Sequence, residues 1–204
     1  MSTNLNKENF RNLTTRSTIY DVIFAIVDAG DDEKKINRIS LKNLSEKVKG
    51  NRKVVEQILQ VNGDEIRYVP LYEYIDDFDE RWTDENDDGL HDNPIPLGMD
   101  KTIAELAVSQ KGQSIKWLKN PKYGFVAQKP DPINIRTASF TERNKYNADF
   151  EKWTIWKNIA IKAVTNDYLA LGKLGGNDAQ KDVDVITAAI NQNGLAIELA
   201  DDDV

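Results

Sequence analysis

The sequence predicts a mainly α protein, an irregular array of degenerate helical-hairpin repeats with a small inserted β-hairpin or extended arm. Three observations predict this fold class. Apolar residues recur around a glycine at helical spacing in several parts of the chain. Of the 204 residues, 40% are hydrophobic and only six are proline, which favours a folded core over disorder. One segment rich in proline and glycine, 120–149, interrupts the helical pattern.

The helical pattern is clearest in three segments that align on Gly63, Gly112 and Gly194. Each has apolar residues nine, five and four positions before the glycine and one three positions after it. Apolar residues at these spacings form one stripe along a helix. We expect each glycine to end its helix in the left-handed conformation, which costs least without a Cβ. A second, shorter helix then folds back, and each unit is a hairpin that cannot bury its apolar face alone.

Two further copies are incomplete. In the fourth copy the same apolar positions are filled, but Tyr168 replaces the glycine. Its turn therefore closes differently, or its two helices run on as one. A half copy at 22–30 has the apolar residues and the glycine but lacks the second helix.

The last copy also carries a family resemblance. Residues 182–200 read Asp-Val-Asp-Val-Ile-Thr-Ala-Ala-Ile-Asn-Gln-Asn-Gly-Leu-Ala-Ile-Glu-Leu-Ala. This stretch resembles a short tandem repeat of unknown function with the core D-x-x-V-V-x-x-A-V-x-x-N-G-x-A-L, found in bacterial, bacteriophage and giant-virus proteins. The resemblance extends to 51–69 and 100–118 and covers about half of the chain. It implies a helical repeat scaffold of viral or bacterial origin and brings no catalytic residues with it.

Five regions follow from these patterns. They are an N-terminal helical region with a basic segment and the first clear repeat (1–70), an acidic loop (71–98), a helical repeat (99–119), the extended arm or β-hairpin (120–149) and the C-terminal helical repeats (150–204). The arm is predicted from two short β-prone runs on either side of Lys129-Pro130-Asp131-Pro132.

The net charge of −7 argues against a surface that binds nucleic acid everywhere. The charges are segregated, however. Residues 34–53 carry eight basic side chains and one acid, whereas residues 73–92 carry ten acids and one base. The two blocks either neutralise each other within one molecule or attract neighbouring copies of the chain.

The acidic loop contains a candidate metal site. Residues 84–92 fit D-x-N-x-D-G-x-x-D, so that Asp84, Asn86, Asp88 and Asp92 could surround one calcium ion. The bidentate glutamate of a complete calcium loop is missing, because that position holds Ile95. The alternative is a solvated acidic loop, and no other cofactor is expected.

A helix-turn-helix motif is the second candidate. Residues 39–48 and 52–59 would be its helices, Ser40 an N-cap, and 64–69 the first strand of a wing. The residues placed to read bases would then be the three at the start of the second helix, Asn51, Arg52 and Lys53. The competing interpretation is that this segment is simply the first repeat.

Catalysis is not expected. The chain has no cysteine, and its single histidine, His91, has no neighbouring nucleophile to activate. The glycines at 172–176 lack the spacing of a phosphate-binding loop. Trp153 and Trp156 share a helix face and serve either in core packing or as interface anchors.

These observations predict a non-enzymatic scaffold or assembly protein that acts through protein–protein contacts, as a structural component of a bacteriophage particle. Its interface residues would be Arg52, Lys53, Trp153 and Trp156, and its partners other proteins or copies of itself. The alternatives are a winged-helix DNA-binding regulator that uses 39–69 and a host-directed effector or inhibitor of a bacterial protein. No apolar run approaches the roughly 18 residues of a membrane span, and the N-terminus does not resemble a signal peptide. The expected location is the cytoplasm or the virion.

Overall fold

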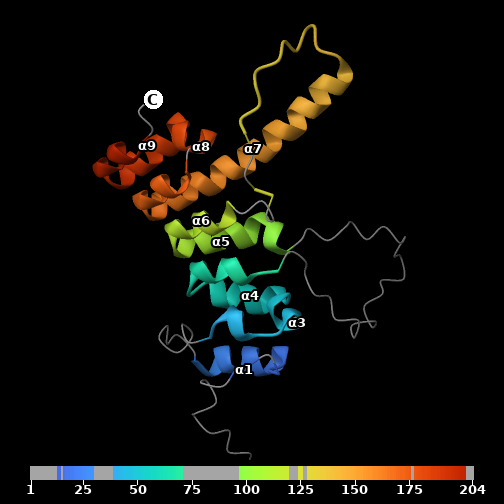
Figure 1. The fold of residues 1–204 in the computed structure, drawn as a ribbon, viewed down its shortest axis with the longest axis vertical. Helices are drawn as coiled ribbons and strands as arrows, with labels where there is room; N and C mark the ends of the chain where they lie inside the picture. The colour runs from blue at the N-terminus through green and yellow to red at the C-terminus, as the bar shows by residue number, and fades with distance from the viewer. Residues whose placement is uncertain are drawn as a thin grey trace, which may run out of the picture.

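The computed structural model describes residues 13–14, 16–29, 39–70, 97–119, 124–125, 128–175 and 177–200. Most of these residues are helical and none of them lies in a β-strand, which confirms the mainly α class. The helices lie one above another in an elongated stack that begins with α1 and ends with α8 and α9 (Figure 1). Within the described ranges, no helix is both long enough and apolar enough to cross a membrane.

The elements follow one another with short connections. The α-helices are α1 (Ile19–Ala29), α3 (Glu46–Lys49), α4 (Arg52–Leu59), α5 (Lys101–Gln110), α6 (Ile115–Leu118), α7 (Phe140–Asn166), α8 (Asp178–Lys181) and α9 (Val183–Gln192). The 3-10 helices are η2 (Leu41–Asn43), η3 (Gly63–Tyr68), η5 (Leu97–Met99), η6 (Gly112–Ser114), η8 (Tyr168–Lys173) and η9 (Gly194–Leu199).

Four times in the described chain an α-helix is followed closely by a 3-10 helix. These helix pairs are α4–η3 (pair 1), α5–η6, which continues into α6 (pair 2), α7–η8 (pair 3) and α9–η9 (pair 4). In pairs 1, 3 and 4 the side chain just before the 3-10 helix, Asn62, Asp167 or Asn193, accepts a hydrogen bond from a backbone N–H two residues later. Tyr168 therefore does not join the helices of pair 3 into one. Pairs pack in chain order, with α4 on α5, α5 on α7 and α7 on α9.

The core runs through the stack as one continuous cluster of apolar side chains. The residue nine positions before the start of the 3-10 helix is fully buried in every pair, and these residues are Val54, Ile103, Ile159 and Val185. The apolar spacing in the sequence therefore reports the buried side of each α-helix correctly.

The glycines, in contrast, do not end helices in a left-handed conformation. Among the described residues, a positive φ occurs at Gly124 and Gly175 only, and Gly63, Gly112 and Gly194 are the first residues of 3-10 helices. That part of the prediction is wrong, because the chain turns at the extended residue before each glycine, and at Asn62 and Asn193 the side chain caps the 3-10 helix that follows. At Gly63 and Gly112 the absence of a side chain serves close packing between pairs.

The predicted β-hairpin within 120–149 is also absent from the residues that the structure describes there. Residues 128–134 run without regular structure, and a turn at 134–138 is closed by hydrogen bonds to the backbone carbonyl of Asn134. Helix α7 then begins at Phe140, ten residues before the predicted boundary at 150. The physical reason is a capping box, in which Ser139 and Glu142 bond each other's backbone N–H groups.

Candidate protein-interaction surfaces

The first half of α7 projects from the stack (Figure 1). The helix has 27 residues, about 40 Å at 1.5 Å per residue, and none of its buried residues precedes Trp153. Residues 128–139 run outward alongside this projecting half, and α7 leads back into the stack (Figure 1). We call residues 128–152 the arm.

The arm exposes large apolar side chains. Ile135 is 63% exposed, Phe140 74% and Phe150 44%. The rings of Tyr146 and Phe150, one helical turn apart, stack with their centroids 5.9 Å from each other. Aromatic side chains held rigidly on a projecting element can bury area on a partner at little cost in side-chain entropy.

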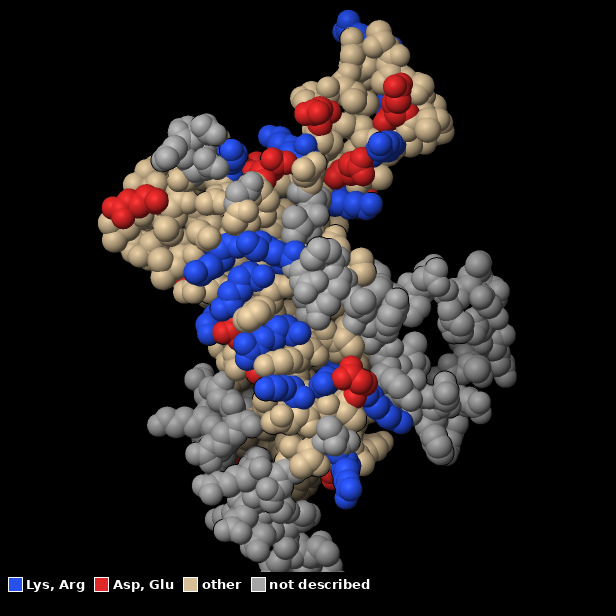
Figure 2. Space-filling view, in the orientation of Figure 1, with Lys and Arg blue, Asp and Glu red and all other residues tan. Residues whose placement is uncertain are grey.

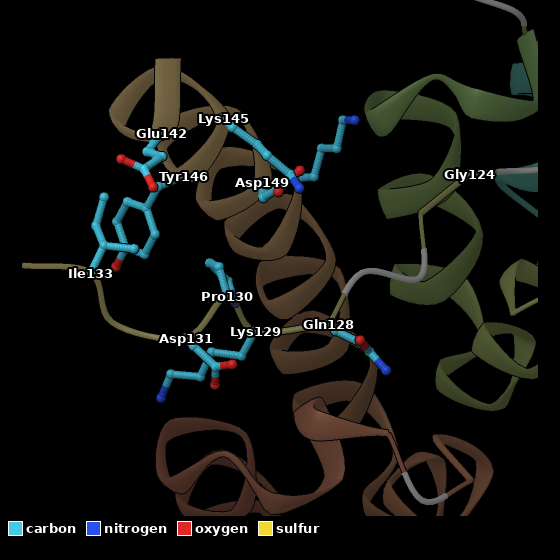
Figure 3. Close-up of a pocket in the computed structure, with 11 residues that line it drawn as sticks. Gly124, Gln128, Lys129, Pro130, Asp131, Ile133, Glu142, Lys145, Tyr146 and Asp149 are labelled. Atoms are coloured by element: carbon cyan, nitrogen blue, oxygen red, sulfur yellow. The ribbon is translucent and has the colours of Figure 1, made fainter. Parts of the chain in front are cut away.

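An open groove lies between residues 128–139 and the first half of α7 (Figure 3). Its volume is about 770 Å³. It is lined by Lys129 and Ile133 from residues 128–139 and by Lys145, Tyr146 and Asp149 from α7. Residues 128–139 are tied to α8 by the Lys129 N–H, which donates to the carboxylate of Asp178 at 2.8 Å. Because both charged and apolar side chains line the groove, it can accept a chain that offers side chains of both kinds.

Trp153 and Trp156 do not belong to this surface. They mark the point where α7 enters the stack, and they are only 2% and 0% exposed. Their prediction as interface anchors is wrong, and the alternative of core packing is confirmed, because two large apolar rings on one helix face are buried by the neighbouring pairs. The indole N–H of Trp156 is buried and makes no hydrogen bond to the described residues.

Arg52 is engaged within the chain. Its guanidinium donates to Asp100 Oδ2 at 2.7 Å, and it lies 3.6 Å from a carboxylate oxygen of Glu56. Asp100 is the N-cap of α5, so this contact joins pair 1 to pair 2. Burial raises the pKa of Asp100, but the hydrogen bonds from Arg52 and from the backbone of α5 lower it by a larger amount. The net pKa of Asp100 is therefore below its ordinary value. Lys53, by comparison, is exposed.

The strand that the winged-helix interpretation predicts at 64–69 is not formed, because residues 63–68 form the 3-10 helix η3. The expected first helix, 39–48, is divided into η2 and the four-residue α3. Ser40 is confirmed as an N-cap, accepting from the Lys42 N–H. Of the three candidate readers, Asn51 caps α4 and Arg52 binds Asp100. The segment is packed as the first helix pair, which uses these side chains internally.

A surface that the sequence analysis did not single out lies over the middle of the stack, where Lys and Arg side chains gather around α6 (Figure 2). We call Arg67, Lys111, Lys116 and Lys119 the basic band. Arg67 and Lys116 both lie over the ring of Trp117, at 5.1 and 4.9 Å from its centroid. The signal was present in the sequence, since Arg67 and Lys116 each stand four residues after the glycine of their pair.

Asp64 organises the basic band from beneath. Its carboxylate pairs with Lys111 and accepts hydrogen bonds from the Trp117 indole at 3.0 Å and the Ser114 hydroxyl at 3.1 Å. Burial raises the pKa of Asp64, but the hydrogen bonds from Lys111, Trp117 and Ser114 lower it more, so its net pKa is below the ordinary value. Pairs 1 and 2 are thus joined at both ends, by Asp64 here and by Arg52 at the start of α5.

Two of the sequence predictions fall outside the described residues. The candidate calcium ligands Asp84, Asn86, Asp88 and Asp92 lie there, together with the rest of the acidic block. Lys34, Lys35 and Arg38 of the basic block also lie there. Within the described ranges, no group of three or more histidine, aspartate or glutamate side chains is arranged to hold a metal ion.

Comparison of the chain with models of protein families, with curated proteins and with solved structures finds no match. The resemblance of residues 182–200 to a bacterial and viral repeat therefore stays a prediction. What can be said of function comes from the arm, the basic band and the ends of the stack.

Proposed function

We propose that this chain is a non-enzymatic scaffold or assembly protein that binds other proteins through its arm. The observation that carries the proposal is the projecting first half of α7, which exposes Phe140 and Phe150 away from the core. A solvated helical segment as short as this projecting half is only marginally stable by its own helix propensity. Contact with a partner would bury its aromatic side chains and stabilise it.

The stack supports the proposal as a rigid base for the arm. We infer that the four helix pairs are degenerate copies of one helical-hairpin repeat, because a corresponding position in the α-helix is buried and apolar in all four and three of them share the same turn cap. Stacked repeats bury a continuous core and leave long side faces for binding other molecules.

Among the described residues, the titratable groups with a shifted pKa fit a non-catalytic role. Hydrogen bonds from the backbone and side chain of Thr18 lower the pKa of Asp21, and those of Ser139 lower that of Glu142, both at helix starts. A hydrogen bond from Lys157 lowers the pKa of Asp184 and in turn raises that of Lys157. Each shift has a cause in capping or in packing between elements, whereas a catalytic centre tunes such groups in a cleft.

The setting of this function is drawn from the family resemblance. A helical scaffold from a viral or bacterial lineage fits a structural component of a bacteriophage particle, with the arm contacting a neighbouring subunit. A host-directed effector would use the same arm on a bacterial protein. The two settings differ in where the arm-dependent partner is found, in purified particles or in host extract.

The test is quantitative affinity capture with matched variants. Phe140→Ser/Phe150→Ser removes two exposed aromatic rings from the arm, and Leu169→Ser/Val183→Ser removes two exposed apolar side chains elsewhere. All four positions are exposed, so both variants should fold. We expect a partner captured by the unaltered chain and the control variant and lost from the arm variant. Capture that is equal for all three chains would contradict the proposal.

A second candidate function, nucleic-acid binding, is favoured by the basic band. Its cations border an indole ring, a combination that holds phosphates and stacks bases. Arg67→Glu/Lys116→Glu should then abolish binding of a fluorescent oligonucleotide that weakens steeply as salt rises. No binding by the unaltered chain at low salt would remove this candidate.

A further inference from the structure

The contacts between the first three pairs follow one steric rule. A Cβ built on Gly63 would overlap the carbonyl oxygen of Ala107 in the next pair, and one built on Gly112 would overlap that of Ala163. In both cases the first residue of a 3-10 helix lies directly against the α-helix that follows it in the stack. Only glycine allows the two backbones to come this close.

An amide side chain accompanies each of these contacts. Gln110 Nε2 donates to the carbonyl oxygen of Val61 in pair 1, at 3.2 Å. Asn166 Nδ2 donates to the carbonyl oxygen of Ser109 in pair 2 at 2.6 Å, and its Oδ1 accepts from the Gly112 N–H at 2.8 Å. Gln110 and Asn166 each stand three residues after the alanine of the steric contact. The incoming helix thus presents an alanine and an amide, one turn apart, to the pair before it.

Pair 4 carries a corresponding face that no helix of the described residues covers. A Cβ on Gly194 would meet no atom of the described residues within 4 Å. Three residues after the first residue of the 3-10 helix, the apolar side chain is fully buried in pairs 1 to 3, but its counterpart Ile197 is 60% exposed. The neighbouring Leu195 is 56% exposed. Ile197 is therefore exposed at a position that is buried in each earlier pair.

Helix α1 forms the opposite end of the described stack (Figure 1). One face of α1 packs inward through Val22, Ala25, Ile26 and Ala29. Its other face exposes Tyr20 by 84%, Phe24 by 58% and Val27 by 71%. The spacings of four and three residues place these side chains on one stripe. This stripe points to where a preceding pair would lie.

We propose that the α9–η9 face of one molecule receives α1 of a second copy, so that the stack continues from chain to chain. This inference rests on the proposed assembly function and names a partner for it. The occupant is a second copy because each end of the described stack exposes an apolar face, and within the stack such faces are covered by the neighbouring pair. Such a head-to-tail contact repeats from copy to copy and builds a filament, or a ring if the rotation closes.

Substitutions that block one end each provide the test. Ile197→Asp places a charge on the receiving face, at a position that is 60% exposed. Phe24→Asp places a charge on the α1 face at an exposed position. Gly172→Ala is the control, because its Cβ would make only an ordinary contact, 3.6 Å from Leu199.

The masses of these chains are measured by light scattering and sedimentation over a range of concentrations, with circular dichroism to verify folding. We expect the unaltered chain and the Gly172→Ala control to grow in mass with concentration and each blocked variant to stay monomeric. An equimolar mixture of the two blocked variants should stop at a dimer, because each retains the face that the other has lost.

An unaltered chain that is monomeric at every concentration would overturn the end-to-end contact and leave the arm proposal to its own capture test. Association that persists in both blocked variants would place the contact elsewhere on the molecule. A mixture that remains monomeric would show that the two faces are not partners. Conversely, loss of arm-dependent capture with intact concentration-dependent growth would remove the arm proposal alone.

Discussion

Gly63 and Ala107 lie in direct backbone contact across the boundary between pairs 1 and 2, with no space for a Cβ on the glycine. The contact sets how closely α5 approaches η3. Because the Gln110 amide and the pair of Lys111 with Asp64 lie on the same boundary, a small displacement of α5 would disturb several hydrogen bonds together.

Gly63→Ala should therefore destabilise the fold. The added methyl group meets a rigid backbone carbonyl rather than a flexible side chain, and we expect a loss of about 1–3 kcal/mol in the free energy of unfolding. Gly194→Ala is the matched control and should stay within about 0.5 kcal/mol of the unaltered chain, since its Cβ meets open space. Urea denaturation measures both. Equal stabilities would contradict the steric account.

This glycine also marks what the sequence could predict and what it could not. The apolar spacing correctly gave the buried positions of α4, such as Val54, because that spacing is a local property of one helix. The role of Gly63 depends on Ala107, which is far away along the chain, so the local rule for glycines at helix ends gave the wrong conformation.

The candidate site shows the same distinction between local properties, which the sequence predicts, and tertiary properties, which it does not. The projecting half of α7 has no apolar stripe to reveal it, and the prolines before it favoured an extended arm, whereas the Ser139–Glu142 capping box was a local signal that went unused. Exposure of the aromatic rings is a tertiary property. The sequence therefore offered Trp153 and Trp156, which are buried, in place of Phe140 and Phe150, which are exposed.

The Arg52–Asp100 pair should couple pair 1 to pair 2 energetically. A double-mutant cycle with Arg52→Met and Asp100→Asn, which retains an N-cap for α5, should give a coupling energy of about 1 kcal/mol. The side chains are partly buried, at 33% and 14% exposure, so we expect more than for a pair in open water. Lys53→Met changes the same charge at an exposed neighbour and should have little effect. A coupling energy near zero would show that Arg52 is only a surface charge.

Stability should fall in mild acid. The pKa values of Asp64 and Asp100 are lower in the folded chain than the value of about 3.9 in the unfolded one. A carboxyl group with a lowered pKa contributes stability that is fully present above the unfolded pKa and is lost as the pH falls through the folded one. Between about pH 5 and pH 3, the urea midpoint should therefore decrease.

Asp64→Asn is the variant that tests this assignment. It keeps an oxygen acceptor for the Trp117 indole but removes the charge that Lys111 pairs with, so the midpoint should change less with pH than in the unaltered chain. Glu151→Gln removes one charge from an exposed position on α7 and serves as the control. A pH dependence that is the same in all three chains would exclude Asp64 as a source.

The capping box should hold the arm independently of the stack. Ser139 Oγ accepts from the Glu142 N–H at 3.2 Å, and the Glu142 carboxylate accepts from the Ser139 N–H at 2.7 Å. Ser139→Ala removes the first bond and should cost about 0.5–2 kcal/mol in local helix stability. Because residues 140–152 have no buried side chain, this loss should appear as faster backbone hydrogen exchange there and leave exchange from Trp153 onward unchanged. Ser139→Asp, which keeps a capping oxygen, should restore slow exchange. If Ser139→Ala instead accelerates exchange along the whole of α7, the projecting half is not a separate unit, and a partner that binds it would also act on the core.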